Sequence, residues 1–180
     1  MLKLETREVA LVGLFAALTA VGAFMRIPLP YVPITLQLFF VLLAGLLLGA
    51  KLGALSQVIY MLIGLAGVPV FAEGGGPGYI FHPTFGFIVG FVVAAWVMGS
   101  FSSKVSKIRI FYSSLVALLL LYLIGITHLY FSINIFLGQE ISLMDAAMIS
   151  LVFVPGDIIK ISILSTIGPA IVKSVKGASF

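Results

Sequence analysis

The stretch Pro155-Gly156-Asp157-Ile158-Ile159-Lys160 lies inside an apolar run, residues 146–172, that is long enough to cross a lipid bilayer. An Asp or a Lys at the middle of such a span costs roughly 2.5–3.5 kcal/mol. The spacing of three residues places Asp157 and Lys160 on one helix face, where they partly neutralise each other. The Pro-Gly pair just ahead interrupts the helix and leaves backbone groups free. This combination favours a polar ligand site over an ion pair that only fixes helix packing.

The composition excludes a soluble protein. The chain has 180 residues, of which 62% are hydrophobic and only 9% are charged, whereas soluble chains are usually about 25% charged. The absence of cysteine excludes disulfides, thiolate metal sites and cysteine nucleophiles. The net charge of +4 does not indicate nucleic-acid binding, because the basic residues follow a membrane topology instead.

The apolar runs predict an all-α integral membrane protein with a single transmembrane domain, residues 1–180. The first run has no small-residue cleavage site after it, so we interpret it as a retained span rather than a signal peptide. The six predicted spans cover about 9–25, 34–49, 52–67, 84–101, 110–131 and 147–172.

We expect the chain to lie in the plasma membrane. The charges predict an orientation with both termini in the cytoplasm. In that orientation, acidic Glu73, Glu140 and Asp145 are outside, and Arg26 is the one basic residue in an outer loop. The other basic residues all fall on cytoplasmic segments, as the positive-inside rule requires: Lys3, Arg7, Lys51, Lys104, Lys107, Arg109, Lys173 and Lys176.

Two loops are expected on the outer side. Residues 26–33 contain three prolines and cannot continue a helix. Residues 68–83 contain Gly74-Gly75-Gly76-Pro77-Gly78, which lacks the Lys-Ser/Thr ending of a phosphate loop, so we interpret the segment as a lid or re-entrant loop carrying Phe71 and Tyr79. His82 has no partners at metal-ligand spacing, and no metal site is expected.

Polar residues at the start of the second span have two possible roles. Thr35 and Gln37 either cap the helix or point into a cavity. In the first span, the small-residue pairs Gly13/Ala17 and Ala16/Ala20 allow another helix to approach closely, which ordinary packing within the bundle also explains.

The charged pair indicates the chemistry of a ligand. Asp157 can accept two N–H donors while Lys160 donates to an oxygen, which complements the edge of a cyclic urea or amide. Aromatic residues of the outer loops would cover an apolar body. The residues alone therefore predict a small, partly polar ligand that enters from outside.

Several blocks of the sequence resemble the BioY family, the biotin-specific S components of energy-coupling factor (ECF) transporters. The departures from the family pattern are Phe85-Gly86-Phe87 in place of Gly-Gly-Tyr, and no Asn in the preceding loop or Arg after the motif. The blocks that carry the resemblance are Ala16-Ala17-Leu18-Thr19-Ala20, Ile27-Pro28-Leu29-Pro30, Pro33-Ile34-Thr35-Leu36-Gln37, Leu42-Leu43-Ala44-Gly45-Leu46-Leu47-Leu48-Gly49, Gly64-Leu65-Ala66-Gly67-Val68-Pro69-Val70-Phe71, Pro83-Thr84-Phe85-Gly86-Phe87 and Pro155-Gly156-Asp157-Ile158-Ile159-Lys160.

The resemblance implies a six-helix S-component fold that captures biotin, with Asp157 and Lys160 on the ureido ring. It implies that Ala16 and Ala20 dock on a transmembrane coupling subunit, and that paired ATPases of the partner complex hydrolyse ATP, since this chain has no Walker A motif. Tyr79, Thr35 or backbone N–H groups would replace the missing contacts to the ligand's carboxylate. The full set of expected ligand contacts is Asp157, Lys160, Tyr79, Thr35, Gln37, Phe71 and Gly86.

Three rival hypotheses are considered at this point, and one of them is a purely structural subunit, which predicts no ligand binding. The chain could be a stand-alone secondary transporter with Asp157 as a proton relay, although no inverted repeat of broken helices is apparent. An intramembrane enzyme is disfavoured because no nucleophile stands beside a base. The sequence therefore predicts a transport protein that is not an enzyme, with no catalytic residue and no cofactor of its own.

Overall fold

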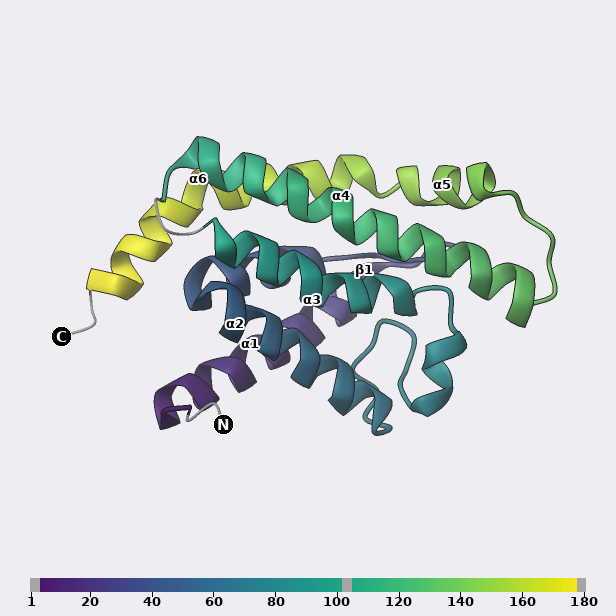
Figure 1. Ribbon diagram of the computed structural model, residues 1–180, viewed down its shortest axis with the longest axis horizontal. Helices are drawn as coiled ribbons and strands as arrows, with labels where there is room; N and C mark the ends of the chain where they lie inside the picture. The colour runs from purple at the N-terminus through teal and green to yellow at the C-terminus, as the bar shows by residue number, and fades with distance from the viewer. Residues whose placement is uncertain (1–3, 102–104, 178–180) are drawn as a thin grey trace.

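The computed structural model describes residues 4–101 and 105–177, which fold into helices and one small pair of strands (Figure 1). Lys3 and Lys104 lie outside these residues, as does the side chain of Lys176. The expected helical architecture is confirmed. In chain order the elements are α1 (Thr6–Phe24), β1 (Arg26–Ile27), β2 (Ile34–Thr35), α2 (Gln37–Leu65), the 3-10 helix η1 (Pro77–Phe81), α3 (Phe85–Ser100), α4 (Lys107–Phe131), the π-helical turn η2 (Ser132–Phe136), α5 (Leu143–Leu151) and α6 (Val154–Gly177).

Helix α2 is a hairpin of two arms that reverses at Gly49. Gly49 has φ 79° and ψ 179°, in a region that glycine adopts readily and other residues avoid. A Cβ added to Gly53 would lie 2.8 Å from the Cα of Gly45, whereas residues eight apart in a straight helix are separated by about 12 Å. The turn predicted at Lys51, between residues 34–49 and 52–67, therefore lies two residues earlier, at the glycine.

The last predicted span, residues 147–172, is corrected by the structure. It is broken into α5, which ends at Leu151, and α6, which begins at Val154. The break lies ahead of the Pro-Gly pair rather than at it. In a continuous helix the ring of Pro155 would clash with the carbonyl four residues earlier, whereas a proline in the first turn of a new helix is tolerated. Asp157 consequently lies in the first turn of α6, near the end of a helix dipole that favours a carboxylate.

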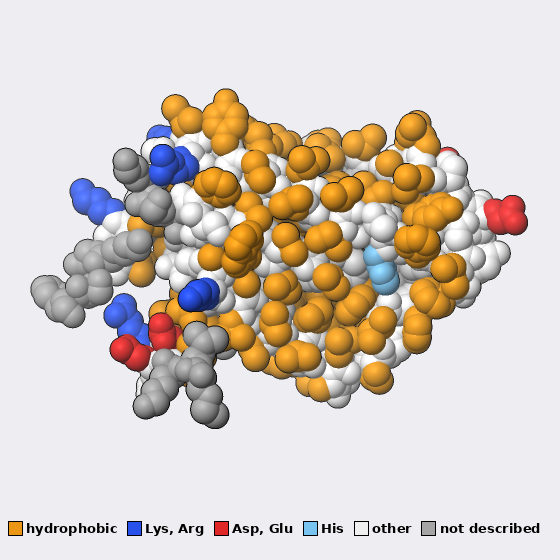
Figure 2. Space-filling model, in the orientation of Figure 1, with side chains coloured by type: hydrophobic (Ala, Val, Ile, Leu, Met, Phe, Trp, Pro, Cys, Tyr) orange, Lys and Arg blue, Asp and Glu red, His pale blue; other side chains and the backbone are white. Residues whose placement is uncertain are grey.

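The exterior of the protein is apolar along most of its length. Among the described residues, four segments are long and apolar enough to cross a membrane by length and composition, the second being the whole α2 hairpin: Thr6–Phe24, Gln37–Leu65, Lys107–Phe136 and Val154–Val175. Helix α3 is a shorter apolar helix. Hydrophobic side chains cover the face seen in Figure 2, and Leu119 and Ile108 are 70% and 72% exposed. Such a surface suits lipid rather than water, so this is a multi-pass membrane protein.

Glycines allow the helices around the interior to pack closely. Helix α3 packs between α2 and α4, and α6 packs against α4 and α2. A Cβ on Gly45 would collide with the carbonyl oxygen of Ala95 in α3, and one on Gly125 of α4 would meet the ring of Phe87. The β1–β2 ribbon, with Arg26 opposite Thr35 and Ile27 opposite Ile34, joins α1 to α2 beside this interior.

Candidate ligand-binding site

A cavity lies among α2, α3, α4 and α6, with β2 and the loop around η1 completing its wall. The empty space inside it is about 610 Å³, part of it open to solvent. The residues that line it come from the whole length of the chain: Val32, Pro33, Ile34, Thr35, Gln37, Leu38, Ala72, Tyr79, Thr84, Phe87, Ile88, Phe91, Leu121, Tyr122, Phe153, Asp157 and Lys160.

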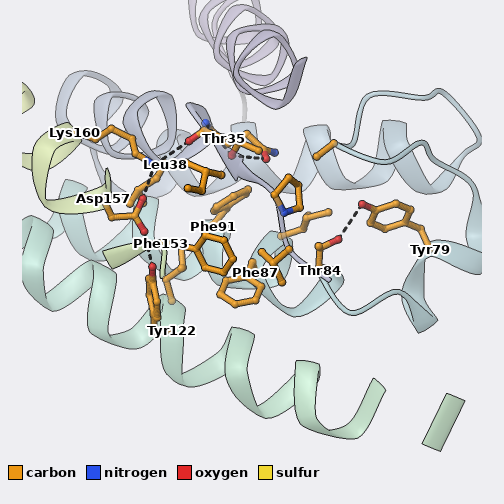
Figure 3. A pocket seen from close by; sticks show the side chains of 17 residues that line it. Thr35, Leu38, Tyr79, Thr84, Phe87, Phe91, Tyr122, Phe153, Asp157 and Lys160 are labelled. Atoms are coloured by element: carbon orange, nitrogen blue, oxygen red, sulfur yellow. Dashed lines mark hydrogen bonds and ion pairs between the residues drawn. The ribbon is translucent and has the colours of Figure 1, made fainter. Parts of the chain in front are cut away.

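One end of the cavity holds a buried ion pair (Figure 3). Lys160 Nζ lies 2.5 Å from Asp157 Oδ1 and also donates to the backbone carbonyl of Thr35 at 2.8 Å. The hydroxyl of Tyr122, from α4, donates to Asp157 Oδ2 at 2.7 Å. Asp157 and Lys160 are only 6% and 9% exposed, so the pairing compensates two charges that burial would otherwise disfavour. The expected pairing of these residues on one helix face is confirmed.

Backbone geometry brings the three elements of this end together. Strand pairing with Arg26 holds Thr35 in an extended conformation, and the N–H of Leu36 donates to the carbonyl of Met25 at 3.2 Å. The Thr35 carbonyl is thereby free to accept from Lys160 instead of taking part in the hydrogen bonding of α2. Lys160 follows Asp157 by one helical turn, so both side chains reach the cavity from the start of α6.

The middle of the cavity is aromatic. Figure 3 shows Phe87, Phe91 and Phe153 between the Asp157 end and the Thr84 end. The ring of Phe87 meets that of Tyr122 edge to face, with centroids 6.0 Å apart. This section can hold the apolar body of a ligand whose polar groups lie at its two ends.

The opposite end carries a line of hydrogen-bonded polar groups. Glu73 Oε2 lies 3.0 Å from His82 Nε2, His82 Nδ1 lies 2.9 Å from Thr84 Oγ1, and Thr84 Oγ1 lies 2.9 Å from the hydroxyl of Tyr79. The Tyr79 and His82 rings stack at 4.6 Å. Burial lowers the pKa of His82 below its usual 6.5, although Glu73 acts in the opposite direction, and burial raises the pKa of Tyr79. Both groups are therefore uncharged near neutral pH.

Five of the seven predicted ligand contacts line the cavity: Asp157, Lys160, Thr35, Gln37 and Tyr79. Phe71 and Gly86 do not. The ring of Phe71 instead fills the notch over Gly64, where an added Cβ would collide with it. Gly86 is held against the side chain of His128 in the same way. Packing of the helices and of the loop holds both residues in these positions.

Gln37 connects the ribbon to the loop that follows α2. Its Nε2 donates to the Tyr60 hydroxyl at 2.8 Å, and its Oε1 accepts from Thr35 Oγ1 at 3.0 Å. Tyr60 in turn donates to the carbonyl of Val70 at 3.0 Å. The side chains of Thr35 and Gln37 are thus bonded to each other at the cavity wall, and Thr35 Oγ1 also accepts from the backbone N–H of Gln37, the first residue of α2, at 3.4 Å.

Sequence reasoning assigned no role to Tyr122, Thr84 or the aromatic lining. Tyr122 lies well inside the predicted span 110–131, where a hydroxyl needs a partner, and that signal was available. Phe87, Phe91 and Phe153 stand in apolar runs where nothing distinguishes a cavity wall from a lipid-facing or core position. Their role is visible only when the helices are assembled.

The small residues of α1 are arranged differently from the expectation. Ala16 is 4% exposed and packs into the protein's own core, and Ala20 is half-buried. The outward-facing pair is Gly13 and Ala17, and nothing lies within 4 Å of the position that a Cβ on Gly13 would occupy. If α1 docks on a partner, Ala16 is not part of the contact.

Comparison with known proteins identifies a family and several relatives that this chain resembles. A sequence model described as the BioY family matches residues 1–177. The chain is 44% identical over 141 residues to the probable biotin transporter BioY of Lysinibacillus sphaericus, covering 77% of this chain and 72% of that protein. It is 38% identical over 186 residues to the putative biotin transporter BioYB of Bacillus subtilis (strain 168), covering 98% and 93%.

A solved structure shares the fold. The crystal structure of the S-component for biotin from an ECF-type ABC transporter aligns with a TM-score of 0.80, over 96% of this chain and 92% of that one. The identity is 24%, so this likeness concerns the fold.

Proposed function

This chain belongs to the BioY family, and from that premise we propose that it captures biotin from outside the cell as the substrate-specificity subunit of an energy-coupling factor transporter. It is a transport protein of the cell membrane and not an enzyme. The observation that carries the proposal is the buried Asp157–Lys160 pair at one end of an aromatic cavity.

The pair has the hydrogen-bonding capacity that a ureido ring requires. Asp157 receives one donor on each oxygen, and each carboxylate oxygen retains acceptor capacity for a ligand N–H. Lys160 has three ammonium protons, of which two are used by Asp157 and Thr35, so one remains for the ring carbonyl. The aromatic section next to the pair would contact the thiophane ring and the aliphatic tail of biotin.

Partner subunits would energise uptake. We propose that a transmembrane coupling subunit and paired ATPases bind this chain, that ATP is hydrolysed on those partners, and that this chain carries no cofactor or metal. The outward face of α1, with Gly13 and Ala17, suits close contact with a partner helix better than Ala16 does. Ala20, half-buried beside that face, would lie at its edge.

The finer topology is also part of the proposal. The chain would form one transmembrane domain in lipid, with six spans when the two arms of α2 are counted separately and with both termini in the cytoplasm. The distribution of charge supports this orientation, since Lys and Arg gather at the end of the molecule where both termini lie (Figures 1 and 2). The cavity would then face outward.

Equilibrium binding of radiolabelled biotin to the purified chain tests the proposal. Unlabelled desthiobiotin, which keeps the ureido ring, should compete, and lipoate, which lacks it, should not, because the polar end recognises the ring. Folded protein that binds no biotin would contradict the proposal. Proton-gradient-dependent uptake by vesicles containing this chain alone would favour a stand-alone secondary transporter instead.

A further inference from the structure

Arg26 is a cation on the side of the membrane where cations are scarce. In the proposed orientation it is the one basic residue in an outer loop, whereas the other basic residues fall on cytoplasmic segments. Its side chain is exposed, and it makes no ion pair and no side-chain hydrogen bond with residues 4–101 or 105–177. The guanidinium is therefore available to a ligand that enters from outside.

The ribbon places Arg26 beside the cavity. Arg26 lies directly opposite Thr35 in the β1–β2 pair, so the two side chains leave the ribbon on the same face. The Cα atoms of such a pair are only about 4.5–5.5 Å apart. Thr35 lines the cavity, and Figure 3 shows it with the ion pair to one side and Tyr79 to the other. The long side chain of Arg26 therefore starts next to the cavity wall.

The charge of Arg26 acts on the end of the cavity that lies away from Asp157. Burial raises the pKa of Tyr79, which lines that end, and the charge of Arg26 acts in the opposite direction. Charges affect a hydroxyl in this way only over short distances. The carboxylate of Glu73 also raises this pKa, but it already has a partner in His82 Nε2 at 3.0 Å. Of these two opposite charges, the cation is the one without a partner.

Gln37 adds a neutral donor on the same stretch of wall. Tyr60 donates its only proton to the carbonyl of Val70, so its oxygen accepts from Gln37 Nε2 at 2.8 Å. The amide oxygen of Gln37 accepts from Thr35 Oγ1. An amide nitrogen carries two protons, and the second proton of Gln37 has no acceptor among the described residues. Since Gln37 lines the cavity, this N–H can meet a ligand oxygen.

We propose that Arg26 binds the carboxylate of the ligand, with the free N–H of Gln37 as a neighbouring donor, and that it makes this chain selective for the free acid. This inference rests on the proposed biotin function. The carboxylate of biotin lies at the end of its aliphatic tail, so a molecule whose ureido ring binds Asp157 directs the carboxylate away from the ion pair. A guanidinium can donate to both oxygens of a carboxylate, which a neutral amide or ester group does not match.

Competition against radiolabelled biotin near neutral pH tests the inference, with unlabelled biotin, biotinamide and biotin methyl ester as competitors. Free biotin is expected to bind about three- to tenfold more tightly than either neutral compound, because water weakens an ion pair with an exposed cation. Biotinamide that binds as tightly as free biotin would overturn the inference. Failure of every ring-containing competitor would instead contradict the biotin function itself.

Variants are read as the ratio of acid to amide affinity within one protein, so a loss of folded material does not change the result. Arg26→Gln should bring this ratio close to one and leave the affinity for biotinamide unchanged, whereas Arg26→Lys, which keeps the charge, should retain most of the preference. Glu73→Gln removes the negative charge near Tyr79 and should raise the ratio.

The matched control is Arg109→Gln, which removes an exposed positive charge from the first turn of α4 and should leave the ratio as in the wild type. A ratio that stays unchanged in Arg26→Gln, or that falls equally in Arg109→Gln, would overturn the assignment of Arg26.

Discussion

Asp157 is held by donors from two different helices, and this arrangement determines how the site can bind. Lys160 belongs to the same helix and neutralises the carboxylate, whereas Tyr122 approaches from α4 and bonds the second oxygen. Removing either donor would leave the carboxylate with one partner and with freedom to rotate. A ligand that bonds both oxygens needs them in a fixed plane, so Tyr122 acts as a positioning residue for Asp157.

Replacing Tyr122 with Phe is expected to weaken biotin binding about ten- to hundredfold. A hydrogen bond to a charged group contributes about 1.5–3 kcal/mol, and the ring packing against Phe87 is retained. Tyr130→Phe, on the same helix but outside the cavity lining, is the matched control and should bind like the wild type. Equal affinity of the Tyr122→Phe protein and the wild type, measured by calorimetry, would exclude the positioning role.

Stability should fall on acidification below about pH 6.5, in part through His82. Burial lowers the pKa of His82 in the folded protein, so between that pKa and 6.5 the unfolded chain binds more protons than the folded one. The contribution of the neutral ring is therefore fully present above 6.5 and lost as the pH falls through this window. Glu73, Tyr79 and His128 all lie close to His82, so the comparison needs a variant.

Thermal unfolding of the wild type and of His82→Phe between pH 7.5 and pH 5 measures this contribution. The Tm of the wild type should fall more steeply than that of His82→Phe. Parallel curves for the two proteins would show that His82 does not contribute.

Single glycines and prolines decide the helix boundaries. The sequence predicts the helical class and the charged site because apolar runs and buried charges are local signals. It placed the reversal of α2 at Lys51 rather than at Gly49, and the helix break at the Pro-Gly pair rather than ahead of it, because a long apolar run shows neither a positive φ nor the clash of a proline ring with the preceding turn. The capping box of Ser142 and Asp145 was a local signal for the start of α5 that was not used.

The contact between the first arm of α2 and α3 should tolerate no added methyl group. Gly45→Ala would place its Cβ against the carbonyl of Ala95, and overpacking of this kind costs about 1–3 kcal/mol. Gly13→Ala, on the outward face of α1 with nothing within 4 Å, is the control and should leave the protein as stable or slightly more stable. Thermal unfolding in detergent that ranks the two variants in the opposite order would contradict the packing described for α2.

At the scale of the whole molecule, the cavity depends on residues that are remote in sequence. Tyr122, Thr35 and Lys160 meet only because α4, the ribbon and α6 converge. Asp157 and Lys160 could be recognised from the sequence because they are neighbours on one helix. The aromatic section and the Glu73–His82–Thr84–Tyr79 line could not be recognised in this way. The arrangement also separates charge along the molecule, with basic residues gathered near the two termini.

Single cysteines can test the orientation because the natural chain has none. Glu140→Cys is expected to react with an impermeant maleimide in intact cells, since the loop before α5 would lie outside. Lys107→Cys, at the start of α4, should react only after the membrane is permeabilised. The reverse pattern of labelling would place the cavity on the cytoplasmic side and would exclude capture from outside.

The central claim is that biotin binds this chain through Asp157, and calorimetric titration of biotin into purified wild-type and Asp157→Asn proteins tests it most directly. The substitution keeps the size of the side chain but replaces one acceptor with a donor and leaves Lys160 without its counter-charge. We predict tight binding by the wild type and an affinity at least tenfold lower in the variant, since hydrogen bonds to a charged group contribute about 1.5–3 kcal/mol. Equal affinity for biotin in two equally folded proteins would contradict the account.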